Sequence, residues 1–116
     1  MSEHEIQCLL IKWASAIPEL KCLFAVPNGG HRHVAVAAKL KREGVKAGVP
    51  DLMLPLARGG YNGLFLEMKA EKGRLSDVQT IWLERLGANG YKTAVCFGFD
   101  SAKNTIMDYL NLCDTR

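Results

Sequence analysis

The chain has 116 residues, 48% of them hydrophobic and 23% charged, with a formal net charge of +3 at pH 7. This length predicts a single domain, residues 1–116, with one hydrophobic core. The composition is not that of a disordered chain, and no apolar run reaches the length of a membrane span. The N-terminus lacks the layout of a signal peptide, and the four cysteines match no zinc-ligand spacing. We therefore expect a cytoplasmic protein, with Cys8, Cys22 and Cys96 packed as reduced thiols in apolar runs.

The first part of the chain predicts a helix, a short strand and a second helix. Residues 2–17 carry apolar residues at the spacing of an amphipathic helix, with Leu9 among those facing inward. Residues 21–26 predict a short strand that is followed by a turn. Residues 33–43 predict a helix, and Gly44 follows its last turn as a typical C-terminal glycine.

The second part predicts an antiparallel hairpin, a helix, a strand and a last helix. Residues 51–56 and 63–69 are the strands of the hairpin. Residues 76–88 predict a helix, residues 91–98 a strand, and Asp100 is expected to cap the last helix. Because helices alternate with strands, the order predicts an α/β fold with a mixed central sheet flanked by helices.

Two charged residues, Glu67 and Lys69, interrupt the otherwise apolar second strand of the hairpin. Side chains alternate between the faces of a strand, so these two project from the same face. Asp51 begins the neighbouring strand, and Pro50 before it stiffens the approach. A plain salt bridge, or a strand end that reaches water, would explain a lone Glu-x-Lys. The nearby Asp51 weakens that explanation.

The carboxylates of Asp51 and Glu67 are expected to converge, and Glu5 joins them if the first helix packs against the sheet. Two carboxylates about 4 Å apart repel by roughly 4 kcal/mol at an effective dielectric constant near 20, more than Lys69 alone can offset. Mg²⁺ or Mn²⁺, which prefer oxygen ligands, would resolve the repulsion. A divalent cation beside a lysine suits hydrolysis of a phosphodiester.

These residues resemble the PD-(D/E)xK nuclease superfamily, with Pro50-Asp51 followed by Glu67-Met68-Lys69. The surrounding segments resemble the VRR-NUC family, from the first helix to about Phe97. The segments that carry this resemblance are VPNGGHR at 26–32, GVKAGVPDLML at 44–54 and FLEMKAEKGRLSDVQTIWLERL at 65–86.

The resemblance implies a restriction-endonuclease-like core and a metal-dependent DNA endonuclease. For short stand-alone bacterial or phage members it further implies a homodimer that resolves Holliday junctions. A flap or nicking nuclease acting on other branched DNA is an alternative, as is a non-catalytic nucleic-acid-binding module of the same fold. The complete set of Asp51, Glu67 and Lys69 argues against a pure binder. Carried over by position, the resemblance gives Asp51, Glu67, Lys69 and Gln79 as catalytic residues and Glu5, Asp51, Glu67 and the Met68 carbonyl as metal ligands.

Glu5 and Gln79 each have a second explanation. Each lies three residues after a serine at the start of a predicted helix, in the pattern of a capping box. The sequence leaves Glu5 open between cap and ligand, and the resemblance favours a site role for Gln79.

Cations gather between His31 and Lys46 and again after Lys69. A solvated basic helix face would explain such a run, and a surface that contacts phosphates is the alternative. The candidate nucleic-acid-binding residues are Asn28, His31, Arg32, Lys39, Lys41, Arg42, Lys46, Lys72 and Arg74.

Overall fold

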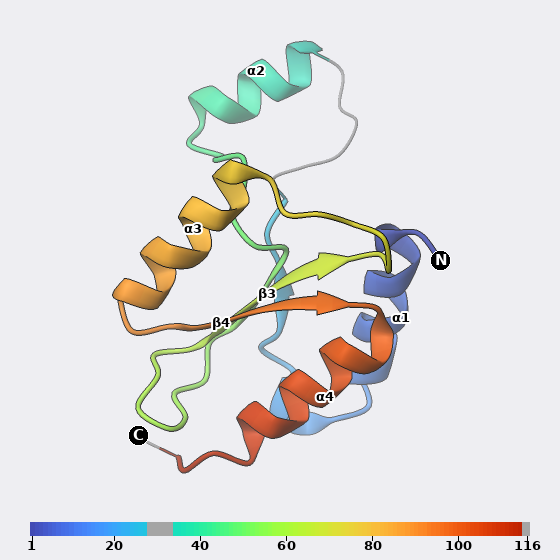
Figure 1. Cartoon of the computed structure of the whole chain (residues 1–116), viewed down its shortest axis with the longest axis vertical. Helices are drawn as coiled ribbons and strands as arrows, with labels where there is room; N and C mark the ends of the chain where they lie inside the picture. The colour runs from blue at the N-terminus through green and yellow to red at the C-terminus, as the bar shows by residue number, and fades with distance from the viewer. Residues whose placement is uncertain (28–33, 115–116) are drawn as a thin grey trace.

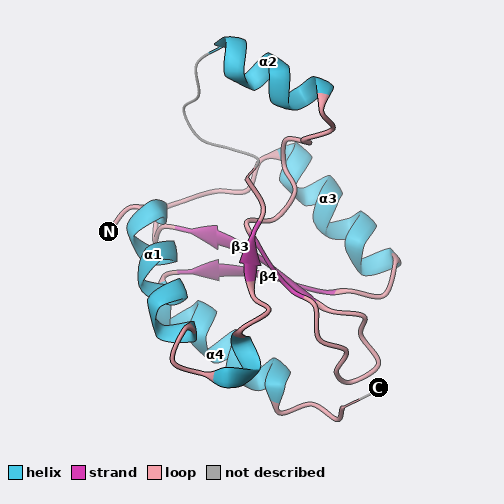
Figure 2. Ribbon diagram, turned by 180° about the vertical axis from the view of Figure 1, so that it is seen from behind, coloured by secondary structure: helices cyan, strands magenta, loops and turns pink. Residues whose placement is uncertain are grey.

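A four-stranded mixed sheet lies between helices on its two faces (Figures 1 and 2), which confirms the predicted α/β architecture. The computed structural model describes residues 1–27 and 34–114. The predictions for Asn28, His31 and Arg32 therefore lie outside the described residues. The elements are α1 (Glu3–Ala14), the 3₁₀ turn η1 (Pro18–Leu20), β1 (Phe24–Ala25), α2 (Val34–Arg42), β2 (Leu52–Leu54), β3 (Leu64–Lys69), α3 (Asp77–Ala88), β4 (Lys92–Phe97) and α4 (Phe99–Leu110).

The strands lie in the order β1-β2-β3-β4. β2 and β3 pair antiparallel, with Leu52 opposite Leu66, so the predicted hairpin is confirmed. β1 pairs antiparallel with β2, and β4 pairs parallel with β3. Pro55 follows the last residue of β2, where its missing N–H removes no bond from the ladder.

The hydrophobic core lies between the sheet and the pair α1 and α4. Leu64, Leu66 and Met68 point from β3 into this core and are almost completely buried. Ile106 and Tyr109 meet them from α4 and are also almost completely buried. Helix α3 lies on the other side of the sheet and contacts β4 (Figure 2).

Glycine and serine residues set the ends of the helices. Ser2 and Ser76 cap α1 and α3 through the predicted capping boxes. Gly90 follows the end of α3 with a φ of +89°, a conformation that glycine adopts without strain. The prediction that Asp100 caps α4 is wrong, because Gly98 is the capping position and Asp100 lies within the first turn.

Two details of the N-terminal half differ from the sequence prediction. The strand expected over residues 21–26 is only Phe24–Ala25, because the N–H groups of Lys21 and Leu23 donate to carbonyls of η1 in turns. On α1 the buried residues are Ile6, Leu10 and Ala14, which recur every four positions. Cys8 and Leu9 lie off that stripe and are exposed.

The expectation that three cysteines are packed in the core is therefore wrong for Cys8 and Cys22, which are exposed, and holds only for Cys96. Helix α2 stands apart from the sheet beyond the N-terminal end of α3 (Figure 1), and none of its residues is buried. Within the described part of the chain, no helix is both long enough and apolar enough to cross a membrane.

Candidate active site

Glu67 and Lys69 lie near the C-terminal end of β3, on the face opposite the core. Their side chains project from the same face, as strand geometry predicts. Both are buried, with only 2% and 6% of their surfaces exposed. The Lys69 Nζ lies 3.8 Å from the Glu67 Oε2, so the two form a buried ion pair when Glu67 is ionised. A buried charge needs a partner, so each of these side chains fixes the position of the other.

Asp51 reaches the same place from the neighbouring strand. The β2–β3 register pairs Leu52 with Leu66, so the preceding residue, Asp51, stands opposite Glu67. Its carboxylate Oδ2 accepts a hydrogen bond of 2.7 Å from the backbone N–H of Met68. The N–H and carbonyl of one strand residue point to the same edge, so the Met68 carbonyl also points toward Asp51.

The crowding of acidic groups perturbs Glu67. Burial is the main cause that raises the pKa of Glu67 to about 8, and the charge of Asp51 raises it further. A hydrogen bond with Asp51 acts in the same direction, while the positive charge of Lys69 lowers the pKa. Without a bound cation, Glu67 therefore keeps its proton at neutral pH, and this proton relieves the repulsion between the carboxyl groups of Glu67 and Asp51. This is the electrostatic demand that a divalent cation would meet.

Gln79 makes two contacts, one in the capping box of α3 and one with the acidic pair. Its side-chain Oε1 accepts a 2.9 Å hydrogen bond from the backbone N–H of Ser76 in the capping box. Its Nε2 donates a 3.3 Å hydrogen bond to the Oε2 of Glu67. The two ends of one amide thus join the start of α3 to the acidic pair, and they fix the orientation of the Glu67 carboxylate.

Glu3 and Glu5, both on the first turn of α1, differ in how they relate to this site. The Glu5 side chain is exposed, and its Oε1 accepts a 3.1 Å hydrogen bond from the backbone N–H of Ser2. This capping contact lowers the pKa of Glu5. Glu3 is close enough that its charge contributes to the raised pKa of Glu67. Glu3 is itself exposed, but it lies three positions before the buried Ile6 and therefore on the same side of α1.

The residues present fit a hard cation that completes its shell with water. Over residues 1–27 and 34–114, no cluster of three or more acidic, histidine or cysteine side chains has the arrangement of a metal site. Two carboxylates and a backbone carbonyl are nevertheless sufficient for Mg²⁺, which keeps several waters and binds substrate phosphates directly. Asp51, Glu67 and the Met68 carbonyl are the groups that would hold it.

The predicted phosphate-contacting cations that the structure describes are all exposed. Lys72 and Arg74 lie in the loop between β3 and α3, close in sequence to the acidic pair. The others lie on α2 and the segment after it, and they are Lys39, Lys41, Arg42 and Lys46. Figure 1 shows α2 at the same end of the molecule as the start of α3, which carries Gln79.

A mixed sheet that presents an Asp, a Glu and a Lys at adjoining strand ends is the core of a PD-(D/E)xK-type nuclease domain. Comparison with known proteins specifies the family. The VRR-NUC domain model matches residues 1–100. A solved structure described as a VRR-NUC domain protein is 32% identical, with a TM-score of 0.86, and the match covers 98% of this chain and 92% of that one. A search among curated proteins found no match.

The chain therefore belongs to the VRR-NUC family, a nuclease domain family whose members generally use divalent metal ions.

Proposed function

We propose that this protein is a divalent-metal-dependent, structure-specific DNA endonuclease that resolves Holliday junctions as a homodimer. The observation that supports this most strongly is the convergence of Asp51, Glu67 and Lys69. Two of these charged side chains are almost completely buried. A protein that only bound DNA would gain nothing from buried acidic groups facing phosphate, because they would repel it.

When bound, Mg²⁺ or Mn²⁺ would polarise the scissile phosphoryl group and lower the pKa of a bound water. Lys69 supplies a fixed positive charge beside the acidic pair, where it orients the attacking water and stabilises negative charge that develops on the phosphate. Gln79 holds the Glu67 carboxylate in place through the 3.3 Å hydrogen bond. Asp51 is held in turn by the backbone N–H of Met68.

The basic surface supports a substrate recognised by its backbone shape. Exposed cations lie on α2, at the same end of the molecule as the start of α3, and in the loop that follows β3. Phosphate contacts fix the position and orientation of DNA without reading its sequence. Two symmetric cuts across a four-way junction require two sites related by a two-fold axis, which a homodimer supplies.

The decisive assay incubates the protein with labelled four-way junction, flap and linear duplex, each with Mg²⁺, Mn²⁺ or EDTA. We expect paired, symmetric cuts on the junction in the presence of either metal and none in EDTA. Preferential cutting of the flap would favour the alternative activity, a flap or nicking nuclease. Absence of metal-dependent cutting on all three substrates would leave only a binding function.

Lys69→Met tests the catalytic role, because methionine keeps most of the apolar side-chain volume and removes the charge. We expect cleavage to fall by at least about 100-fold, as when a transition-state donor is lost, with DNA binding nearly unchanged. The matched control is Lys12→Met on the exposed face of α1. Equal cleavage by the two variants would contradict the proposed role of Lys69.

A further inference from the structure

The outer edge of β4 carries backbone groups that the sheet does not use. The N–H groups of Lys92 and Gly98 donate to carbonyls of the β3 side, at 2.9 and 3.0 Å. Alternate residues of a strand direct their backbone groups to opposite edges. Thr93, Val95 and Phe97 therefore direct theirs away from β3, and β4 is the last strand of the sheet. Among the residues that the structure describes, none pairs with this edge as a strand.

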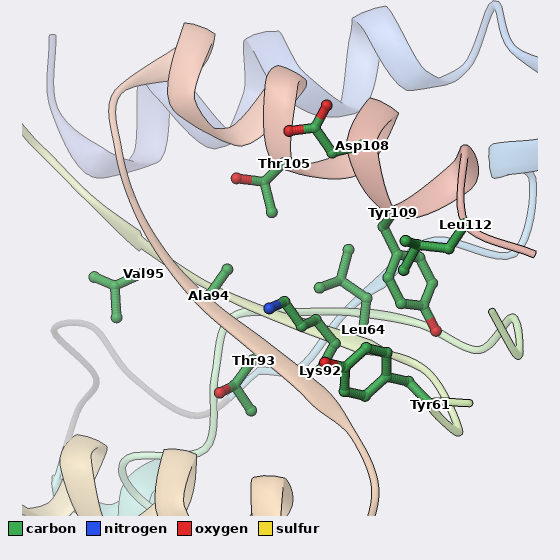
Figure 3. A pocket seen from close by; sticks show the side chains of 10 residues that line it. All are labelled: Tyr61, Leu64, Lys92, Thr93, Ala94, Val95, Thr105, Asp108, Tyr109 and Leu112. Carbon is green, nitrogen blue, oxygen red and sulfur yellow. The ribbon is translucent and has the colours of Figure 1, made fainter. Parts of the chain in front are cut away.

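This edge is open and, apart from a lysine at its first position, lacks the features that usually protect one. Natural edge strands are guarded by proline, bulges or inward-pointing charges. β4 has no proline, and its only charged residue is Lys92, at its first position. A groove of about 530 Å³ runs between β4 and α4 (Figure 3), where Thr93 and Val95 lie on one side of the strand and Lys92 on the other. Phe97, at the end of the strand, is 47% exposed.

We propose that β4 pairs with β4 of a second copy of this chain, antiparallel and with the two-fold axis at Val95. The two four-stranded sheets then form one continuous sheet across the dimer. This inference names the interface of the homodimer and rests on that part of the proposed function.

The available hydrogen-bonding groups determine the register. With the axis at Val95, Val95 pairs with its symmetry mate, and Thr93 pairs with Phe97 of the second copy. Every outward-facing residue of β4 then exchanges hydrogen bonds. An axis at Thr93 would require the N–H of Tyr91, which already donates to the Leu86 carbonyl at 3.1 Å. An axis at Phe97 would require residues that belong to α4, so only the Val95 register uses the whole strand.

The side chains also suit self-pairing in this register. Lys92, the only charge on the strand, stands opposite Gly98 of the second copy and does not meet another cation. Thr93 and Phe97 form a cross-strand pair of a β-branched and an aromatic residue, a favourable combination in antiparallel sheets. The half-exposed surface of Phe97 is then covered.

This arrangement bears directly on cleavage. Val95 is the register partner of Glu67 in the β3–β4 ladder, so both copies of Glu67 lie level with the two-fold axis. They are separated by three strand spacings, or about 14 Å. The axis is perpendicular to the sheet, so both acidic pairs open on the same face. One dimer would therefore present two sites to one junction.

Disulfide cross-linking tests the register without using nuclease activity. The background carries serine at the exposed cysteines, Cys8, Cys22 and Cys113. In the proposed dimer the two Val95 Cα atoms are about 5.5 Å apart, within disulfide range. The two Thr93 Cα atoms are about 14 Å apart, well outside it. Under mild oxidation, V95C is expected to give a covalent dimer at least tenfold faster than the matched variant T93C.

Light scattering of the wild-type protein accompanies this experiment. A dimer in solution in which V95C fails to cross-link, or in which T93C cross-links equally fast, would overturn the proposed interface. A monomer at all concentrations would overturn it as well. Thr93→Pro removes an outward N–H and leaves the ladder with β3 intact, so it should give a folded monomer with a melting temperature close to that of the wild type.

The interface and the proposed nuclease activity can fail separately. Rapid V95C cross-linking without junction cleavage would support the interface and refute the activity. Junction cleavage by a dimer in which V95C does not cross-link would refute only the interface.

Discussion

Replacing Glu67 with glutamine should stabilise the metal-free protein at alkaline pH. Glutamine has the shape of the protonated glutamic acid, so it can still accept from Gln79 and donate to Asp51. The wild-type carboxyl has a folded-state pKa of about 8 against a reference value of 4.5, mainly because it is buried. In the folded state the proton is therefore retained over a pH range in which the unfolded chain has lost it.

The sign of the pH dependence follows from proton binding. Between about pH 4.5 and pH 8 the folded state binds more protons at Glu67 than the unfolded state does, so the free energy of unfolding falls as pH rises. The fall is complete above the folded-state pKa. Glu67→Gln lacks the titrating group and should lack this slope.

The size of the effect follows from the shift in pKa. At 1.36 kcal/mol for each pKa unit, the rise to about 8 corresponds to at most about 5 kcal/mol. Asp51 is only half-buried, so water reaches the pair and screens part of this interaction. We expect the variant to be more stable than the wild type by about 2 kcal/mol above pH 8, or about 8 °C in melting temperature, and nearly equal at about pH 5.

Urea unfolding in EDTA, followed by tryptophan fluorescence, measures this difference. Glu84→Gln, at an exposed position on α3, is the matched control and should keep the wild-type pH slope. Added Mg²⁺ or Mn²⁺ should stabilise the wild type and leave Glu67→Gln almost unchanged, because a ligand stabilises only the state that binds it. If the free energy of unfolding has the same pH slope in the wild type and in Glu67→Gln, the raised pKa of Glu67 is refuted.

Two further predictions use matched pairs of substitutions. Glu3→Gln should weaken metal binding, measured by calorimetry, by about tenfold, as for other groups that act through a ligand. Glu5→Gln should leave metal affinity unchanged, because glutamine completes the same capping box. A larger loss for Glu5→Gln would show that Glu5 moves to the metal. Gly48→Ala should destabilise the protein by about 1–3 kcal/mol more than Gly44→Ala, measured by urea unfolding. Both glycines have positive φ, but only at Gly48 would a Cβ lie 2.9 Å from α3; equal losses would contradict this.

The central part of the site could be predicted because it depends on local geometry. The alternation of side chains along β3 determines that Glu67 and Lys69 share a face, whatever packs against that face. The hairpin then determines the position of Asp51, since its register places Asp51 opposite Glu67. Each step involves residues close in sequence, and a hydrophobic pattern of period two identifies the strands.

The choice between Glu3 and Glu5 could not be made in the same way. It depends on how α1 rotates about its axis, and that rotation follows from tertiary packing. The sequence offered Leu9 as an inward residue, which would have turned Glu5 toward the sheet. The buried stripe instead passes through Ile6 and Leu10, so the exposed Glu3 lies on the side of α1 that faces the sheet and Glu5 does not. The signal was present in the four-residue spacing of Ile6, Leu10 and Ala14.

The prediction that Asp100 caps α4 was wrong for a related reason. Asp100 is a good capping residue, but the helix starts earlier, because Gly98 takes a φ of +94° that turns the chain out of β4. The N–H of Gly98 also donates to the Lys69 carbonyl, which ties this turn to the end of β3. The ladder therefore runs one residue past β4, and the helix begins immediately after it. Tertiary hydrogen bonding decided this boundary, and side-chain propensity did not.

The geometry at the end of β3 explains why the chain accepts an unfavourable group there. The Lys69 ammonium pairs with Glu67 at 3.8 Å, yet the pKa of Glu67 is still raised, so the lysine does not balance burial and the Asp51 charge. A second cation from the protein would balance them and would also occupy the space that a metal ion and a phosphate need. In the proposed enzyme, the deficit of positive charge is what favours binding of a metal ion. In the proposed enzyme, stability is therefore lower in the free protein and recovered when metal binds.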